Sequence, residues 1–382
     1  MSRLRISRME LVLLLSLSFF TTQQTQAQGL GWQAAKDEAV ARGVAWIRVS
    51  NSDGELVNWS TSLAGLVVLG QRDAEGSAPP LGYRFSTQQD QALLQEMAKY
   101  VVDNVVAANP FIDDIRAMGY AVSFLNQFSL TGGPDDVGAT RLVSQSLRDG
   151  IASLLSRQNT ANGDPACARG GWALQGSDAH DLWYTQVASS ALSSGLRNPA
   201  IQDVHQSIAE GLELTAELLT ATALPTGGWP LRPCTSATLH LTSTSALLHL
   251  NGTLNGSSVE IRQRQALNQL AQQFNLSSTT NSNERYHQML WGLVRMKQTL
   301  SEALTSPPYF VWTPLRIPEA DGYPDETPSL MYDVHHTLLS QQNEDGTFPC
   351  LLNAGFLCER PVHATLFGLL TLQENITGAC ID

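Results

Sequence analysis

The stretch GGWALQGSDAHDLWYTQVASSAL, residues 170–192, decides the fold predicted for this chain. It is matched downstream by GGWPLRPCTSATLHLTSTSALLHL, residues 227–250. In both stretches the Trp of a Gly-Gly-Trp element precedes, by thirteen residues, a Thr in a segment rich in small residues. This equal spacing indicates a repeated structural unit. The two pairs are Trp172 with Thr185 and Trp229 with Thr242.

Outward from these stretches, apolar residues recur at three- and four-residue spacing, which predicts helices throughout. Two kinds of helix alternate strictly and form six pairs. One kind is amphipathic, with a polar face: 33–48, 88–107, 140–156, 199–221, 259–274 and 328–341. The other is poor in charge and rich in Ala, Ser, Thr and Gly: 59–70, 113–127, 181–195, 238–250, 284–299 and 363–374.

A helix without a charged face is usually buried on all sides, so the second kind is predicted to form an inner ring inside the first. Each of its members carries a small residue near its start, which allows a neighbouring helix backbone to come close. We therefore predict an all-α fold, an (α/α)6 toroid or barrel of six inner and six outer helices. The alternative is an open solenoid of helix pairs. The small residues are Ala64, Gly119, Ala188, Ser245, Gly292 and Gly368.

The N-terminus is expected to lie outside this fold. Three arginines precede the apolar run LVLLLSLSFF, and Thr25-Gln26-Ala27 supplies small residues for cleavage, so residues 1–27 are typical of a secretory signal peptide. The expected product is a secreted or periplasmic chain of one domain, 28–382, with its repeats in about 31–374 and no transmembrane segment. Its formal net charge of −12 before cleavage argues against nucleic acid as a partner.

The five cysteines are free to oxidise in an exported protein. Cys350 and Cys358 are close in sequence and form the first predicted disulfide. Cys167 and Cys234 lie beside the two Gly-Gly-Trp loops and are the candidates for a second. No Cys-x-x-Cys or Cys/His cluster is present, so no metal site and no cofactor are predicted.

Three segments together resemble the repeats of the prenyltransferase and squalene-oxidase repeat proteins: LLSRQNTANGDPACARGGW, DLWYTQVASSAL and LLSQQNEDGTF. The run from Gln342 to Phe348 is similar to the Gln-x-x-x-Gly-x-Trp element of that family, with Phe in the Trp place. The resemblance covers roughly 31–374 and implies the α/α toroid of terpenoid cyclases and protein prenyltransferases.

The catalytic signatures of those enzymes do not carry over. Bacterial-type triterpene cyclases use Asp-x-Asp-Asp, whereas the nearest string here, 111–114, reads Phe-Ile-Asp-Asp. Protein prenyltransferases bind zinc through Asp-x-Cys and His, but Trp183 stands where the Cys after Asp181 is required. The Gly-Cys-Gly-Glu-Gln of thioester proteins is absent. The chain thus lacks the acid, the metal ligand and the thioester that these chemistries need.

Polar residues at the start of the inner helices are the candidate site. Each has an ordinary interpretation, since Asp at a helix N-terminus caps free N–H groups. In a closed ring, however, these ends converge on one opening, where carboxylate, His and Tyr are the groups of acid–base sugar chemistry. The candidates are Asp113, Asp114, Asp181, Tyr184, His240, Tyr286, His287 and His363.

Two further groups complete the candidates. Trp172 and Trp229 are expected to wedge the interface between repeats, with a ligand-contacting position at the mouth as the alternative. Tyr332, Asp333, His335 and His336 form a polar string on an outer helix, where we expect a solvated face.

Three functional hypotheses remain open. The first is an exported toroid that binds a ligand or partner without the chemistry of the resembling family. The second is a carbohydrate-active (α/α)6 enzyme, a glycan hydrolase or lyase. The third is a divergent terpenoid cyclase. The corresponding ligands are a small molecule, a lipid or isoprenoid, or a glycan, and the sequence does not decide whether the protein is an enzyme.

Overall fold

The computed structural model describes residues 31–72, 80–107, 114–160, 169–173, 181–224, 229–230, 286–299, 312–349 and 361–374. Within these ranges the chain is all-α, with helices and no β-strand. None of the described helices is both long enough and apolar enough to cross a bilayer.

Helices stand at ten of the twelve predicted positions, and the other two, 238–250 and 259–274, lie outside the described residues. The inner type comprises α3 (Trp59–Leu69), α6 (Ile115–Leu130), α8 (Leu182–Gly195), α12 (Tyr286–Thr299) and α15 (Pro361–Leu372). The outer type comprises α2 (Trp32–Ser52), α5 (Gln88–Tyr100) with the π-helical η1 (Val101–Ala107), α7 (Val143–Ser156), the 3-10 helix η3 (Pro199–Val204) with α9 (His205–Thr222), and α14 (Leu330–Gln341). A short helix, α4 (Gly82–Phe85), was not predicted.

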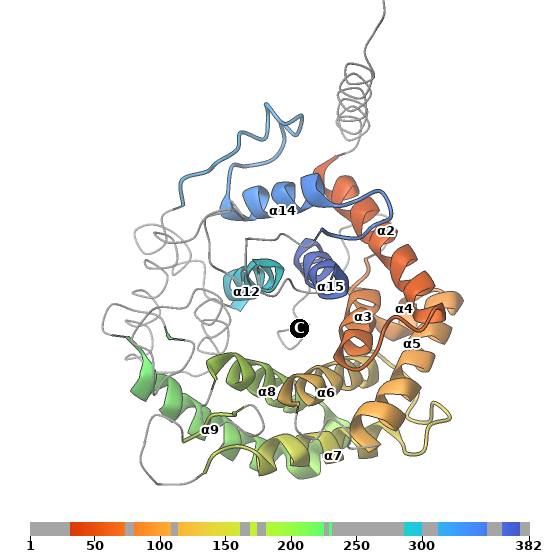
Figure 1. The fold of residues 1–382 in the computed structure, drawn as a ribbon, viewed down its shortest axis with the longest axis vertical. Coiled ribbons are helices and arrows are strands. Elements are labelled where there is room, and N and C mark those ends of the chain that lie inside the picture. The colour runs from red at the N-terminus through yellow and green to blue at the C-terminus, as the bar shows by residue number, and fades with distance from the viewer. Residues whose placement is uncertain are drawn as a thin grey trace, which may run out of the picture.

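The two helix types occupy different positions in the molecule. In Figure 1, α3, α6, α8, α12 and α15 lie nearer the middle of the view, while α2, α5, α7, α9 and α14 lie toward its periphery. The helices α3, α6 and α8 are buried along almost their whole length, as expected of a helix without a charged face. Among the described helices, those of the charge-poor kind thus lie nearer the middle of the view than the amphipathic ones.

Two glycines among the small residues of the inner helices lie where another segment approaches closely. A Cβ added to Gly119 would lie 2.5 Å from Cγ1 of Val187, so α6 and α8 approach closely because position 119 has no side chain. A Cβ added to Gly368 of α15 would lie 3.0 Å from the ring of Phe348. Ala64 and Ala188 are fully buried as well.

In two described loops that each carry a glutamine followed by a glycine, the glutamine side chain bonds both to its own loop and to another outer helix. We call this contact the glutamine clasp. Gln158, just after α7, donates from Nε2 to the carbonyl oxygens of Gly170 (3.0 Å) and Gly211 (2.7 Å). Gly170 has a φ of +88°, and an added Cβ would overlap the carbonyl oxygen of Leu214 in α9. Glycine is therefore required at position 170 both for its conformation and for the close approach of α9.

The same clasp recurs at the C-terminal end of the chain, where it binds the N-terminal end. Gln342 donates from Nε2 to the carbonyl oxygens of Ala39 in α2 (2.9 Å) and of Gly346 (3.0 Å). Gly346 has a φ of +86°, and an added Cβ would overlap the carbonyl oxygen of Arg42, also in α2. The last outer helix is thus joined to the first by the contacts that join α7 to α9.

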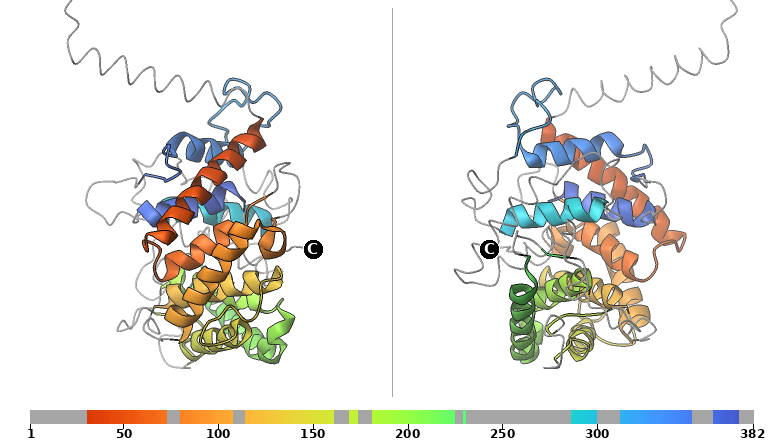
Figure 2. Two further views of the ribbon diagram at one scale, coloured as in Figure 1. Left: turned by 90° about the vertical axis from the view of Figure 1, so that its right-hand side faces the viewer. Right: turned by 60° about the vertical axis from the view of Figure 1, so that its left-hand side comes forward.

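Further contacts hold the first and last helix pairs together. Gln373 donates from Nε2 to the carbonyl oxygen of Val67 in α3 (2.7 Å), and Lys36 pairs with Glu374 at 3.1 Å. Helix α15 packs against α2 and α3, and α14 packs against α2. Both views of Figure 2 accordingly show the red N-terminal helix beside the blue C-terminal ones.

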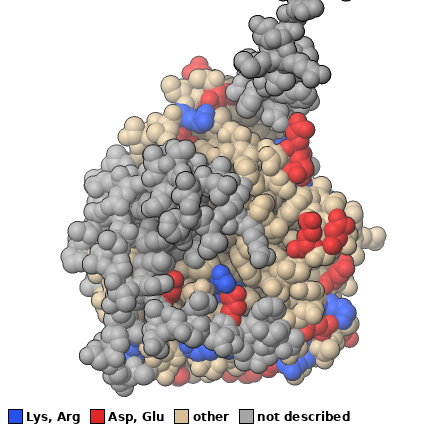
Figure 3. All heavy atoms as spheres, in the orientation of Figure 1, with Lys and Arg blue, Asp and Glu red and all other residues tan. Residues whose placement is uncertain are grey.

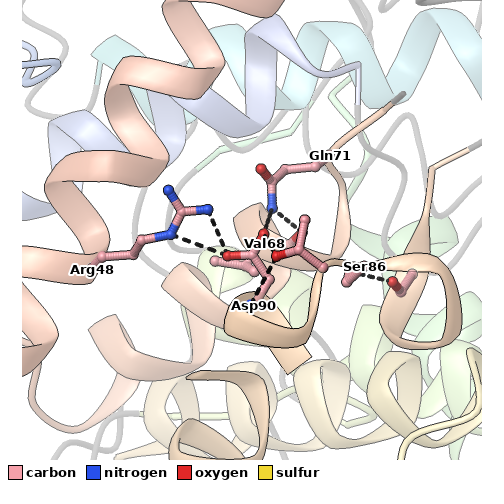
Figure 4. Close-up of polar contacts among 7 residues, drawn as sticks. Arg48, Val68, Gln71, Ser86 and Asp90 are labelled. Atoms are coloured by element: carbon pink, nitrogen blue, oxygen red, sulfur yellow. Dashed lines mark hydrogen bonds and ion pairs between the residues drawn. The ribbon is translucent and has the colours of Figure 1, made fainter. Parts of the chain in front are cut away.

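A buried carboxylate links three segments of the N-terminal region (Figure 4). The side chain of Asp90 in α5 is only 4% exposed and accepts hydrogen bonds from Arg48 of α2 through Nη2 (2.7 Å) and Nε (3.2 Å). Gln71, after α3, approaches the other carboxylate oxygen at 3.4 Å, and Thr87 donates to it at 3.0 Å. One side chain therefore connects α2, α3 and α5.

We expect Asp90→Ala to lower the free energy of unfolding by about 2 kcal/mol, because Arg48, partly buried, then loses its carboxylate. Glu38→Ala is the matched control, since it removes a pair with Arg42 that lies on the surface, and its cost should stay below about 0.5 kcal/mol. Urea unfolding of both variants measures the difference. Equal losses would contradict the role given to Asp90.

Candidate functional site

An ion pair lies at the start of inner helix α6. Asp114 caps this helix: its Oδ1 accepts from the backbone N–H of Arg116 at 2.9 Å. The same carboxylate holds the side chain of Arg116, with Nε to Oδ1 at 2.9 Å and Nη2 to Oδ2 at 3.0 Å. The pair is partly exposed, 28% for Arg116 and 22% for Asp114. Burial opposes the charged guanidinium, but the hydrogen bond and charge of Asp114 outweigh it, so the pKa of Arg116 is raised.

Aromatic rings surround this guanidinium. The Cζ of Arg116 lies 5.4 Å from the ring centroid of Trp183, 5.7 Å from that of Tyr184 and 5.9 Å from that of Trp59. These distances are within the range of cation–π attraction. Trp59 in turn stacks on His363 at 3.7 Å and on Tyr120 at 5.6 Å. We call this group the aromatic–arginine cluster: Trp59, Asp114, Arg116, Tyr120, Trp183, Tyr184 and His363.

The cluster is assembled from the N-terminal halves of four inner helices, α3, α6, α8 and α15. Trp59, Asp114, Arg116 and His363 are partly exposed, whereas Tyr120, Trp183 and Tyr184 are buried. Figure 3 shows that the charged side chains of the described residues on this face lie mostly toward its rim, with few near its middle. The cluster thus has a polar, accessible edge on an aromatic base.

Backbone strain adjoins the accessible edge. Asn58, directly before Trp59, has φ 59° and ψ −127°, a conformation unusual for a residue other than glycine. The turn is held by hydrogen bonds from Ser60 Oγ to the Val57 carbonyl (2.6 Å) and from Thr61 Oγ1 to the Leu56 carbonyl (3.0 Å). Residues held in such conformations concentrate at functional sites, so the strain before Trp59 supports a role for this ring.

A second arginine lies among aromatic rings on α12. Arg295 is 3% exposed, and its Cζ lies 4.6 Å from the ring centroid of Trp291, which contacts Phe367 of α15 at 5.5 Å. Phe367 also contacts Tyr120 of the cluster at 6.2 Å. Burial lowers the pKa of Arg295 to about 10, and the charge interaction with Tyr120 opposes this shift. The aromatic base of the cluster therefore continues onto α12.

Of the residues predicted for the site, the structure brings Asp114, Tyr184 and His363 together in the cluster. Asp181 caps α8, its Oδ1 accepting from the Trp183 backbone N–H at 2.7 Å. His287 lies elsewhere: it is 2% exposed and its ring packs against Phe348 at 5.8 Å. Both described carboxylates at these helix starts thus act as caps.

The two tryptophans of the Gly-Gly-Trp elements are buried between helices. Trp172 donates from Nε1 to the Leu154 carbonyl of α7 (2.8 Å), and Trp229 donates to the Leu219 carbonyl of α9 (2.9 Å). These are the contacts of a wedge between helices, and neither ring belongs to the cluster. The predicted residues Asp113, His240, Cys167, Cys234, Cys350 and Cys358, together with the side chain of Tyr286, lie outside the described residues.

The expectation of a solvated polar face around Asp333 on α14 is wrong. Asp333 is fully buried and accepts hydrogen bonds from Trp312 Nε1 (2.7 Å) and from the backbone N–H groups of Leu315 (2.8 Å) and Arg316 (3.1 Å). The segment 312–329 folds over this face of α14. These three donors satisfy the carboxylate and offset the free-energy cost of burying its charge. Tyr332 and His335 are buried with it, while His336 is partly buried.

Sequence reasoning missed Trp59, Arg116, Tyr120 and Trp183 as members of the site. A signal was available, because Arg116 is the one charged residue between Ile115 and Leu130. A charge that is retained in a buried helix needs a partner or a function. The ion-pair partner of Arg116 is Asp114, two residues earlier, but its aromatic partners come from α3 and α8, which spacing along the chain does not reveal.

The geometry supports binding more directly than proton transfer. Asp114 and Asp181 both accept hydrogen bonds from their own helices, and Asp114 also pairs with Arg116. In the part of the chain that the structure describes, no three His, Cys, Asp or Glu side chains gather as metal ligands.

No family model matches this chain, and no curated protein matches it.

Proposed function

We propose that this protein is an exported, closed (α/α)6 toroid that binds a ligand at the aromatic–arginine cluster without performing the chemistry of the family it resembles. Closure is supported by the contacts of α14 and α15 with α2 and α3, and by the glutamine clasp that occurs both within the chain and between its two ends. The clasp also supports the resemblance to prenyltransferase and squalene-oxidase repeats, because its Gln and Gly belong to the motif that carries it. Export is supported by residues 1–27.

One observation carries the binding proposal: a partly exposed ion pair, Asp114–Arg116, surrounded by aromatic rings from four inner helices. Ligand sites combine mainly apolar and aromatic surface with a few fixed polar groups. For stability alone, apolar residues would serve as well at this position, since a partly buried ion pair adds little to stability. Asp114 fixes the guanidinium, and Asn58 holds Trp59 at the accessible edge under strain.

The proposal does not extend to acid–base catalysis of glycan cleavage. That reaction needs two carboxyl groups facing the same bond. Asp114 and Asp181, the two described carboxylates at the inner-helix starts, are engaged as caps. We therefore keep carbohydrate as a candidate ligand of the cluster and not as a substrate that it cleaves.

The test is calorimetric titration of the mature chain with three ligand classes: neutral oligosaccharides, oligogalacturonates and farnesol. We expect saturable binding of one class and a loss of about tenfold or more in affinity on Trp59→Ala, because stacking on an aromatic ring contributes about 1–3 kcal/mol. Phe85→Ala is the control, since Phe85 is an aromatic residue 72% exposed on α4 and is not a member of the cluster. Absence of saturable binding to all three classes, or equal losses in both variants, would overturn the proposal.

A further inference from the structure

We infer that the ligand of the aromatic–arginine cluster is a neutral sugar, held by its ring hydroxyls on Asp114 and Arg116. This inference rests on the proposed binding function and names the ligand class. Two features support it: the donor and acceptor atoms of Asp114 and Arg116 that the pair itself does not use, and the absence of net charge on the pair.

The ion pair leaves a donor on Arg116 and an acceptor on Asp114 with capacity for a ligand. Arg116 uses Nε and Nη2 on Asp114, while its Nη1 bonds to none of the described residues. Asp114 Oδ1 accepts from Arg116 N, Arg116 Nε and, at 3.4 Å, Ala117 N, whereas Oδ2 accepts, among the described residues, only from Arg116 Nη2. A donor and an acceptor on one ion pair can serve two hydroxyls of a sugar, because one hydroxyl can donate to the carboxylate while another accepts from the guanidinium.

Rings at the same edge match the apolar face of a sugar. Trp59 and His363 are partly exposed and stacked at 3.7 Å, and the Trp59 ring lies 5.9 Å from the guanidinium. A pyranose has hydroxyls around its rim and C–H groups on its faces. A ligand bonded to the ion pair is therefore within reach of an aromatic surface suited to those C–H groups.

The other two ligand classes fit less well. An acidic ligand needs uncompensated positive charge, but the bidentate bond of Asp114 neutralises Arg116. An isoprenoid chain would cover the exposed edges of Asp114 and Arg116 without replacing their bonds to water, which is costly. A neutral polyol replaces those bonds and adds no charge.

Asp114→Asn separates the three classes by the sign of its effect. Asparagine caps a helix as well as aspartate does, so α6 is expected to form. The carboxylate charge is lost, and an amide NH2, which donates, takes the place of the accepting Oδ2. A neutral sugar should bind about tenfold more weakly or worse, as expected for losing a hydrogen bond to a charged group. An acidic ligand should bind more tightly, because Arg116 is then uncompensated. An apolar ligand should bind equally well or better.

The measurement is calorimetric titration of the full mature protein and of Asp114→Asn with neutral gluco-, manno-, galacto-, xylo- and N-acetylglucosamine oligosaccharides, oligogalacturonate and farnesol. Asp203→Asn is the control, since Asp203 pairs with Arg148 on the surface, and it should change nothing. Binding of a neutral oligosaccharide that Asp114→Asn weakens supports the inference. Binding of farnesol or oligogalacturonate alone, lost in Trp59→Ala, leaves the proposed site standing and overturns the sugar. Binding of none overturns both.

Discussion

Gly170→Ala is expected to lower the free energy of unfolding by about 3 kcal/mol or more. Two separate causes contribute. Alanine at a φ of +88° is strained, and its Cβ overlaps the carbonyl oxygen of Leu214, so the loop after α7 must move away from α9. That movement also stretches the bonds from Gln158 to Gly170 and Gly211.

Gly54→Ala separates these causes. Gly54 has a φ of +71°, but an added Cβ meets nothing within 4 Å, so only the conformational cost of about 1 kcal/mol applies. Urea unfolding of the two variants under identical conditions gives the difference. If both variants lose the same free energy of unfolding, the positive φ alone explains the need for glycine at position 170. The close approach of α9 to Gly170 would then be contradicted.

Trp172→Ala should cost about 3–5 kcal/mol, the range for removing a large buried aromatic side chain. The Trp172 ring is fully buried, and its Nε1 donates to the Leu154 carbonyl at 2.8 Å. Its loss leaves a void between α7 and α8 and removes one of two donors to the Leu154 carbonyl, the other being the Arg157 backbone N–H at 3.2 Å. The measurement is again the free energy of unfolding in urea.

Trp172→Phe is the matched variant, because the chain itself carries Phe348 at the corresponding place. The backbone N–H of Phe348 donates to Thr365 Oγ1 (2.9 Å), as that of Trp172 donates to Thr185 Oγ1 (3.2 Å). We expect a loss of about 1–2 kcal/mol, for the indole hydrogen bond and part of the ring volume. A cost for Trp172→Phe as large as that for Trp172→Ala would mean that the wedge depends on the indole N–H and not on its bulk.

The positions and the two kinds of helix were largely predictable because they depend on local periodicity and composition. The charge-poor composition of α6 and α8 marks helices buried on all sides, and Gly119 marks a close contact between them. Helix ends were predicted less well: α6 begins at Ile115 and continues to Leu130, past the predicted end at 127, and α4 was missed. End positions depend on caps and neighbouring segments more than on periodicity.

The sequence by itself determined the all-α class, the alternation of two helix kinds and the start of α8 at Asp181, since caps and hydrophobic spacing act within a few residues. Only the tertiary structure decided that Trp59, Arg116 and His363, far apart in the chain, share one cluster, that His287 packs against Phe348 instead, and that Asp333 is buried. Charge pairing, stacking and burial depend on which helices become neighbours. That choice is made by the packing of the whole chain, and no local pattern contains it.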